Sequence, residues 1–301
     1  MGDDKKLRLR TDRAGAGVVV HDLTYARHDP GHVLAPALFR SLGPRDRKQL
    51  KLDVTYLHGD DRIEFRGHEP LGADDLRVLQ GLVAMSGKDG LILRDDGTGT
   101  DGAQQLLLDL FTPPGAIVTA EQKPDTLVVR DSFRALARAV GMDEGGASIK
   151  QIRKSVERLF GVTIFVERRK KRTGMRLLSA YASDEGSGDL YVALNPRIAG
   201  AILGDTQHVR IELAEVRGLE SDPARVIHQR LCGWIDPGKT RRAKMDTLMG
   251  YAWPDPPTPA AVRKRRVKVR SAMEELRQVG WSITEDRDLT FEIGRPPLPS
   301  S

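Results

Sequence analysis

One stretch of the chain, residues 258–280, constrains the fold more than any other because both of its ends carry helix signals. Thr258 is a residue type that caps helix N-termini, and Pro259 stands at the first helical position, where its missing N–H costs nothing. Gly280 closes the stretch with the residue that most readily adopts the left-handed backbone found after a helix. The sequence therefore predicts one long helix between these signals.

The two faces of this predicted helix differ in chemistry. Four apolar residues recur at helical spacing and predict a stripe that packs on a core: Val262, Val269, Met273 and Leu276. Six of the eight residues at 263–270 are Lys or Arg. They are the candidates for contact with a polyanion: Arg263, Lys264, Arg265, Arg266, Lys268 and Arg270.

A hairpin is expected directly after this helix. Residues 281–294, WSITEDRDLTFEIG, contain two short runs of strand-favouring residues around a charged turn. A helix followed by a hairpin is typical of a winged helix-turn-helix, in which the helix enters a DNA groove and the hairpin forms the wing. The charge run alone leaves a solvated surface or an acidic protein partner open as alternatives.

A second copy of this order of elements lies upstream, and internal repetition favours the winged-helix interpretation. Asp131 or Ser132 is expected to cap a short helix that ends at Gly141, and Ser148 to cap a second helix that ends at Gly161. A hairpin follows, with five consecutive basic residues at its turn. The candidate DNA contacts of this copy are Lys150, Gln151, Lys154 and Arg158 on the helix and Arg168, Arg169, Lys170, Lys171 and Arg172 on the hairpin.

The remaining segments alternate between strand and helix patterns. Residues 52–57 and 62–65 predict a hairpin, and residues 72–85 a helix. Strands are expected at 104–111 and 126–129. Further expected elements are a strand and helix at 188–203, a strand and helix at 207–219, and a helix after Ser221.

The composition limits the class of protein. The 301 residues carry a net charge of +6, which favours a polyanionic partner such as DNA. No apolar run approaches the ~20 residues that span a bilayer, and the N-terminus lacks the apolar core of a signal peptide. We therefore expect a cytoplasmic protein with no membrane partner. The single cysteine, Cys232, excludes an internal disulfide and a Cys-rich metal site.

Two motifs suggest other chemistry. Residues 233–240, GWIDPGKT, satisfy the phosphate-loop pattern, but that loop works only where a strand enters and a helix leaves, and here a helix enters. His228 and Cys232 are spaced like two zinc ligands on one helix, but without further ligands a packed helix is the preferred interpretation. We expect no metal, no cofactor and no catalytic residue.

Several long stretches of the chain resemble one family closely. They include RHDPGHVLAPALFRSL, LYVALNPRIAGAI, QHVRIELAEVRGL, HQRLCGWIDPGKT and RKRRVKVR, in this order from residue 27 to residue 270. In them the chain resembles the iteron-binding replication initiators (replication protein C) of IncQ-type broad-host-range plasmids. It departs in a longer N-terminal tail and in a Gly- and Asp-rich insert at 94–102.

The resemblance implies a bacterial initiator that binds direct repeats at a plasmid origin as double-stranded DNA. It also implies opening of an adjacent A·T-rich segment and recruitment of a plasmid-encoded helicase and primase. A homodimer is a further expectation for the free protein. A winged-helix transcriptional repressor remains an alternative, and a phosphate-loop NTPase centred on Lys239 is a second one.

The expected fold class is therefore α+β, with two tandem winged-helix domains related by a pseudo-repeat. Disordered tails are expected at 1–25 and 296–301. The first domain is expected to span 26–194 and the second 195–295.

Overall fold

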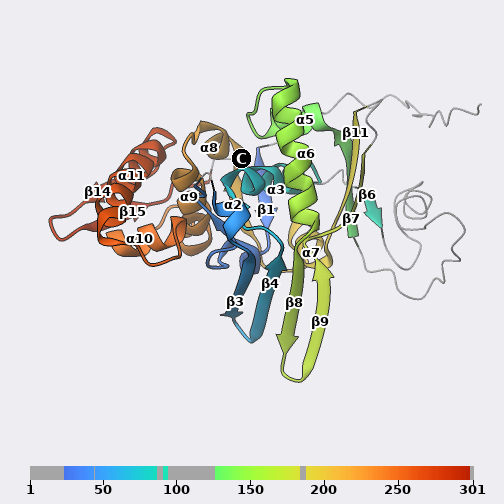
Figure 1. Ribbon diagram of the computed structural model, residues 1–301, viewed down its shortest axis with the longest axis horizontal. Coiled ribbons are helices and arrows are strands. Elements are labelled where there is room, and N and C mark those ends of the chain that lie inside the picture. The colour runs from blue at the N-terminus through green and yellow to red at the C-terminus, as the bar shows by residue number, and fades with distance from the viewer. Residues whose placement is uncertain (1–23, 44, 87–90, 94–125, 184–187, 299–301) are drawn as a thin grey trace, which may run out of the picture.

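The computed structural model describes residues 24–43, 45–86, 91–93, 126–183 and 188–298 (Figure 1). The expected tail up to residue 23, the expected strand at 104–111 and the insert at 94–102 lie outside these ranges. Within them the protein is a mixture of helices and mostly antiparallel sheets, as the sequence predicted.

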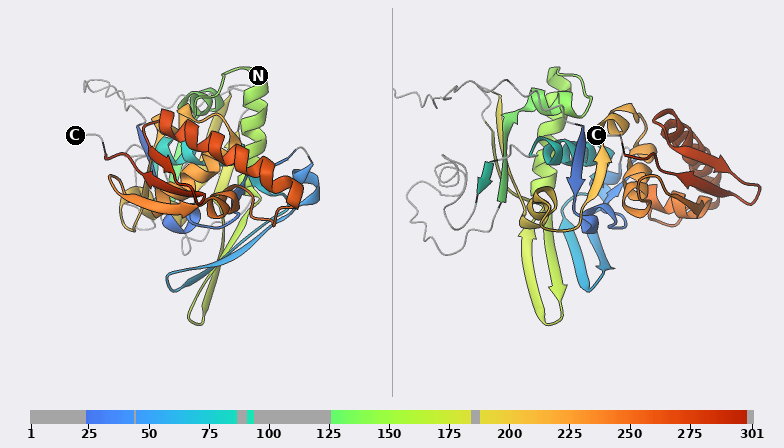
Figure 2. Two further views of the ribbon diagram at one scale, coloured as in Figure 1. Left: turned by 90° about the vertical axis from the view of Figure 1, so that its left-hand side faces the viewer. Right: turned by 180° about the vertical axis from the view of Figure 1, so that it is seen from behind.

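Two adjacent hairpins form one four-stranded sheet, with strand order β3-β4-β8-β9. The strands are β3 (Leu52–His58), β4 (Asp61–Gly67), β8 (Thr163–Arg168) and β9 (Lys171–Arg176). β4 pairs with β8 antiparallel, so the hairpins lie side by side although about a hundred residues separate them in the chain. Both project from the body of the molecule in the same direction (Figures 1 and 2).

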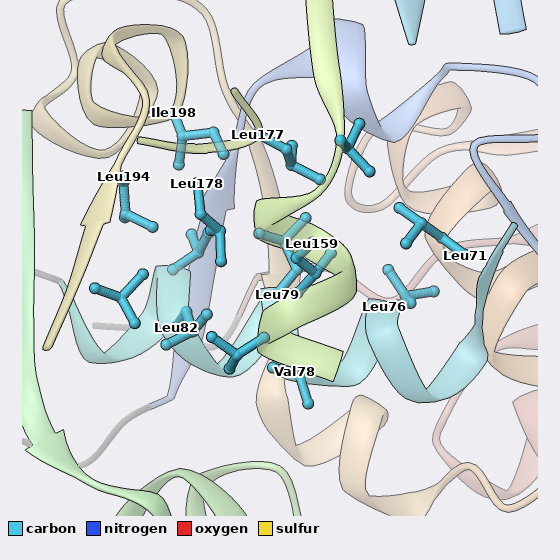
Figure 3. Close-up of a cluster of buried hydrophobic side chains, with 14 of the residues drawn as sticks. Leu71, Leu76, Val78, Leu79, Leu82, Leu159, Leu177, Leu178, Leu194 and Ile198 are labelled. Carbon is cyan, nitrogen blue, oxygen red and sulfur yellow. The ribbon is translucent and has the colours of Figure 1, made fainter. Parts of the chain in front are cut away.

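A second four-stranded sheet has the order β10-β11-β7-β6. Its strands are β10 (Leu178–Ser183), β11 (Asp189–Leu194), β7 (Thr126–Ser132) and β6 (Leu91–Leu93). Four helices share a core with the two sheets: α3 (Ala73–Met85), α5 (Phe133–Ala139), α6 (Gly146–Phe160) and α7 (Pro196–Leu203). Figure 3 shows the centre of this first core, where Leu79 of α3 and Leu159 of α6 meet Leu178 of β10.

The C-terminal part of the chain builds a smaller unit around a second core. Its helices are α9 (Asp222–Trp234), α10 (Met245–Ala252) and α11 (Pro259–Gln278), and its three-stranded sheet is β13-β15-β14. These strands are β13 (Thr240–Lys244), β14 (Ser282–Glu285) and β15 (Thr290–Gly294). Met273 and Leu276 of α11 pack with Trp281 and Phe291 in this core.

Short elements join the two cores. They are β1 (Tyr25–His28), α1 (Pro30–Val33), β2 (Phe39–Arg40), α2 (Asp46–Gln49), β5 (Leu71–Gly72), β12 (Val209–Glu212) and α8 (Leu213–Gly218). β1 pairs antiparallel with β12, and β2 pairs parallel with β5. The buried amides of Gln80 and Gln229 hydrogen-bond across α3 and α9 at 2.9 Å. The two cores interleave along the chain, since the first includes Leu213 and Val226 and the second includes Val33 and Ile211. The boundary expected at residue 195 stays a prediction.

The two copies seen in the sequence share their order of elements but not their strand pairing. In each copy a strand precedes two helices and a hairpin: β7, α5, α6, β8–β9 and β13, α10, α11, β14–β15. In the second copy β13 pairs with β15 of its own hairpin. In the first copy β7 pairs with β11 and β6, and the hairpin joins β4 instead.

The predicted helix ends are mostly confirmed. Thr258 Oγ1 accepts a hydrogen bond from Ala261 N at 3.3 Å, and Gly280 has a φ of 96°. Ser132 Oγ caps α5 by accepting from Ala135 N at 3.1 Å. The cap predicted at Ser148 is wrong, because α6 begins earlier and its N-cap is Gly145.

Candidate nucleic-acid interface

The outward face of α11 carries most of the basic residues predicted there. Exposed side chains are Arg263, Lys264, Lys268 and Arg270, whereas Arg265 and Arg266 are half-buried. Arg265 donates to the carbonyl oxygen of Asp255 at 2.7 Å and lies over the ring of Trp253. Arg270 forms a fork of hydrogen bonds of 2.8–3.0 Å with Glu285 of β14, which ties the helix to its hairpin.

The exposed face of α6 is shorter and less charged. Lys150, Gln151 and Lys154 are all exposed and follow one another at helical spacing, opposite the buried Ile152 and Val156. No ion-pair partner for Lys150 or Lys154 lies within the part of the chain that the structure describes. They remain able to contact a ligand through their polar ends.

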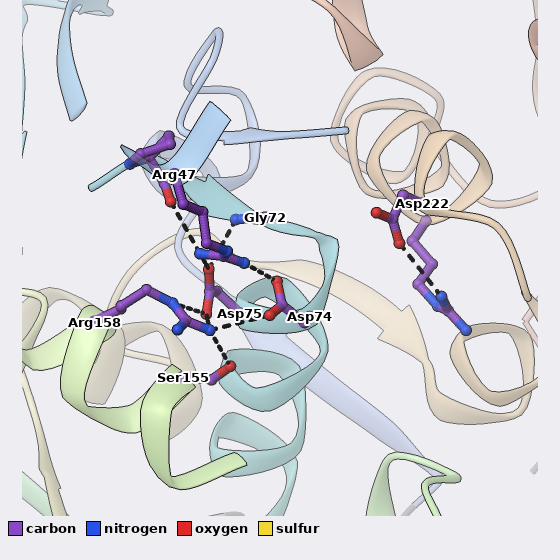
Figure 4. Close-up of polar contacts among 9 residues, drawn as sticks. Arg47, Gly72, Asp74, Asp75, Ser155, Arg158 and Asp222 are labelled. Carbon is purple, nitrogen blue, oxygen red and sulfur yellow. Dashed lines mark hydrogen bonds and ion pairs between the residues drawn. The ribbon is translucent and has the colours of Figure 1, made fainter. Parts of the chain in front are cut away.

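Arg158, the fourth residue predicted on this helix, lies in an internal ion-pair network instead (Figure 4). Its Nε donates to Asp75 Oδ1 at 2.9 Å, and its Nη2 donates to Asp74 Oδ2 and to Ser155 Oγ at 3.0 Å. Arg47 of α2 binds the same two carboxylates from the other side. The Arg158 side chain is 15% exposed and Asp75 is 0% exposed, so this placement favours a structural role.

The turn of the β8–β9 hairpin presents exposed basic side chains at the far end of the sheet. Arg169, Lys170 and Lys171 are exposed there, and Arg169 adopts a left-handed backbone with a φ of 56°. Arg168 and Arg172 also reach solvent, but each is paired. Arg168 Nε donates to Asp61 at 2.5 Å, and Arg172 Nη2 donates to Glu64 at 2.9 Å.

Further arginines, which were not among the residues predicted from the sequence, lie on the outer face of this sheet. Arg62 and Arg66 of β4 lie 2.6 and 3.0 Å from the carboxylate of Glu64, which also binds Arg172. The hydrogen bond from Arg172 and the charges of the neighbouring arginines lower the pKa of Glu64. The sequence indicates this grouping, because Arg62, Glu64 and Arg66 are spaced two residues apart, and that spacing places strand residues on one face of a sheet.

The phosphate-loop pattern at 233–240 has the wrong elements on both sides. Helix α9 precedes this segment and strand β13 follows it. A phosphate-binding loop needs the reverse, a strand before the loop and a helix after it. Gly238 occupies a turn with a φ of 73°, and Lys239 is exposed. The backbone amides of a helix N-terminus, which would hold phosphate, are therefore not supplied by this segment.

Glu215 of α8 joins His228 and Cys232 in a buried cluster that spacing along one helix could not reveal. His228 Nε2 lies 2.5 Å from Glu215 Oε2 and 3.4 Å from Cys232 Sγ. Trp281 Nε1 donates to the same Glu215 oxygen at 3.1 Å. Burial alone lowers the pKa of His228, but Cys232 and Glu215 overcome it and raise that pKa to about 10.

This cluster is described best as a buried ion pair. A structural zinc site has four protein ligands, and a catalytic zinc site has three ligands that contact the ion instead of one another, with water in the fourth position. Among the described residues the group of potential ligands contains only these three, and the histidine nitrogen already contacts the carboxylate directly.

Across the part of the chain that the structure covers, no helix is both long enough and apolar enough to span a membrane.

The fold of the chain is similar to that of solved structures. Two crystal structures of domains 2 and 3 of RctB, one of them a selenomethionine derivative, share the fold with a TM-score of 0.53 at 13% identity. Each match covers 88% of this chain, and the matches cover 98% and 95% of those chains. No curated protein matches.

The sequence itself matches a protein family over residues 20–297, and that family is described as replication protein C. The match spans nearly the whole chain, including both cores and both basic helices. The chain therefore belongs to the replication protein C (RepC) family, and this membership supports a role as a replication initiator.

Proposed function

We propose that this initiator binds direct repeats at a plasmid origin through two winged-helix modules, with α6 and α11 as the reading helices. One observation carries the proposal. Each of these helices leads directly into a hairpin, buries one side in a core and presents exposed basic or amide side chains on the other. A recognition helix with these properties enters the major groove of duplex DNA.

The exposed residues divide into two groups by their chemistry and position. Lysine and arginine side chains on the helices can donate to guanine O6 and N7, and a glutamine can pair with adenine. The proposed reading residues are Lys150, Gln151, Lys154, Arg263, Lys264, Lys268 and Arg270. Residues at the hairpin turn contact phosphates and set the register. These are Arg169, Lys170 and Lys171, with Arg168 and Arg172 at the base of the turn.

Three residues of the predicted set take other roles in this proposal. Arg158 is left out because its guanidinium is bound to Asp74 and Asp75 and its side chain is only 15% exposed, against 45% for the paired Arg270. Arg265 and Arg266 are half-buried, and they orient α11 rather than read bases. Arg265 does so through Asp255, and Arg266 lies 3.9 Å from Asp246.

Several bound copies would bend the origin, and the strain would open the adjacent A·T-rich segment, where the duplex deforms most easily. We propose that a plasmid-encoded helicase and primase then enter at the opened strands, and that the free protein is a homodimer. The role is non-catalytic, since binding and bending supply the work. No surface of the chain is assigned to the helicase.

The proposal is tested by measuring affinity for the repeats of the protein's own origin and for scrambled duplex over a salt series. Neutralising about 6–10 phosphates should reduce affinity about 10³- to 10⁵-fold between 50 and 200 mM salt. Repeat-dependent binding with that slope supports the proposal, and equal weak binding to both duplexes refutes it. Protection of a single palindrome at a promoter, with no repeats, would instead identify a repressor.

A further inference from the structure

Val267 is an apolar side chain on the solvent face of the basic helix α11. It is 60% exposed, while Val269, two residues later, is 0% exposed in the second core. Two residues turn an α-helix by about 200°, so the two valines point in opposite directions. Among the described residues the other exposed large apolar side chains are Leu57 and Leu298, and neither lies on a helix.

The neighbours of Val267 on this face are polar. Arg263 and Lys264 lie one turn before it, and Arg270 and Ser271 one turn after it; all four are exposed. Positions three and four apart are neighbours on a helix surface, so Val267 stands at the centre of a basic face. Arg270 is held by Glu285, which gives the face a defined orientation relative to β14.

One apolar residue on a surface is common and needs no explanation by itself. Val267 differs from such a residue because it lies in the middle of the α11 face that, in the proposed function, contacts the DNA. Valine also has a lower helix propensity than the Lys and Arg residues that fill the surrounding positions. Its χ1 angle is stiff, so little rotamer entropy is lost when the side chain is covered.

The major groove offers one apolar group among its base edges, the 5-methyl group of thymine. Resting on the proposed function, we infer that Val267 packs against such a methyl group and makes one position of the repeat thymine-specific. The basic residues before and after it would contact the flanking bases and phosphates. This contact adds sequence information that the lysines and arginines cannot supply, because they donate only to acceptors.

The test replaces each thymine of the repeat, one at a time, by deoxyuridine, which lacks the methyl group and keeps every hydrogen-bonding atom. Burial of one methyl-sized group predicts about a fourfold loss of wild-type affinity at one position. Val267→Ala should bind the natural repeat about fourfold more weakly and should not distinguish thymine from uracil at that position. Leu57→Ala, which shortens an exposed apolar side chain outside the helix, should keep the wild-type difference.

The outcomes separate this inference from the proposed function. Repeat-specific binding with no thymine position that depends on Val267 overturns the inference and leaves the proposed function standing. The inference is also overturned if Val267→Ala loses affinity equally for the thymine and uracil repeats. The same holds if Val267→Ala keeps its DNA affinity and instead loses binding to a partner protein. Absence of repeat-specific binding by the wild type removes both.

Discussion

Replacement of Arg158 by Ala should destabilise the protein and leave the DNA affinity of the folded protein unchanged. The substitution removes hydrogen bonds of 2.9–3.0 Å to Asp75, Asp74 and Ser155. Hydrogen bonds to charged groups contribute about 1.5–3 kcal/mol each, and breaking a buried ion pair costs about 3–5 kcal/mol. Asp75 would keep Arg47 and the amide of Gly72 as partners. We therefore expect the free energy of unfolding to fall by about 2–4 kcal/mol.

Urea unfolding measures this loss, and repeat binding below the unfolding transition measures the affinity. Lys154→Ala is the matched control, since Lys154 lies one turn away on the same helix and is exposed. It should change stability by no more than about 0.5 kcal/mol and weaken repeat binding by about 1–3 kcal/mol. The reasoning is refuted if Arg158→Ala keeps its stability and loses repeat affinity as Lys154→Ala does.

Three further predictions address packing, charge and the phosphate-loop motif. A Cβ at Gly81 would lie 2.5 Å from Val140 Cγ1, so Gly81→Ala should cost about 1–3 kcal/mol of stability by overpacking α3 against α5. Gly250→Ala, at an exposed helical site with nothing within 4 Å, should stabilise by up to about 1 kcal/mol; equal effects at the two glycines would contradict the packing argument. Because the pKa of His228 is raised from 6.5 to about 10, its contribution to stability is full below pH 6.5 and lost as the pH rises toward about 10. The difference in unfolding free energy between wild type and His228→Gln should therefore shrink across that window, and a constant difference would argue against the buried pair. Calorimetry should show the same absence of nucleotide binding in the wild type and in Lys239→Ala, and nucleotide affinity that disappears in the variant would restore the phosphate-loop hypothesis.

The amino-acid sequence by itself determined the elements whose signals are local. The ends of α11 follow from Thr258, Pro259 and Gly280, because capping and backbone preferences depend on a few adjacent residues. Hairpin turns and the apolar stripes of α6 and α11 are local in the same sense. The cap of α6 was misplaced because Ser148 has the right chemistry, but the chain already turns helical at Gly146.

The interpretation of single charged residues required the three-dimensional arrangement. Helical spacing places Lys154 and Arg158 one turn apart on a face that looks uniformly basic. Only the packing of α3 against α6 brings Asp74 and Asp75 beside Arg158, from 84 and 83 residues away in the chain. Similarly, Glu215 reaches His228 through the fold, and β7 pairs with β11 rather than with the hairpin of its own copy. Such contacts depend on how the whole chain closes on its cores, since hydrophobic burial is non-directional and local preferences do not select a distant partner.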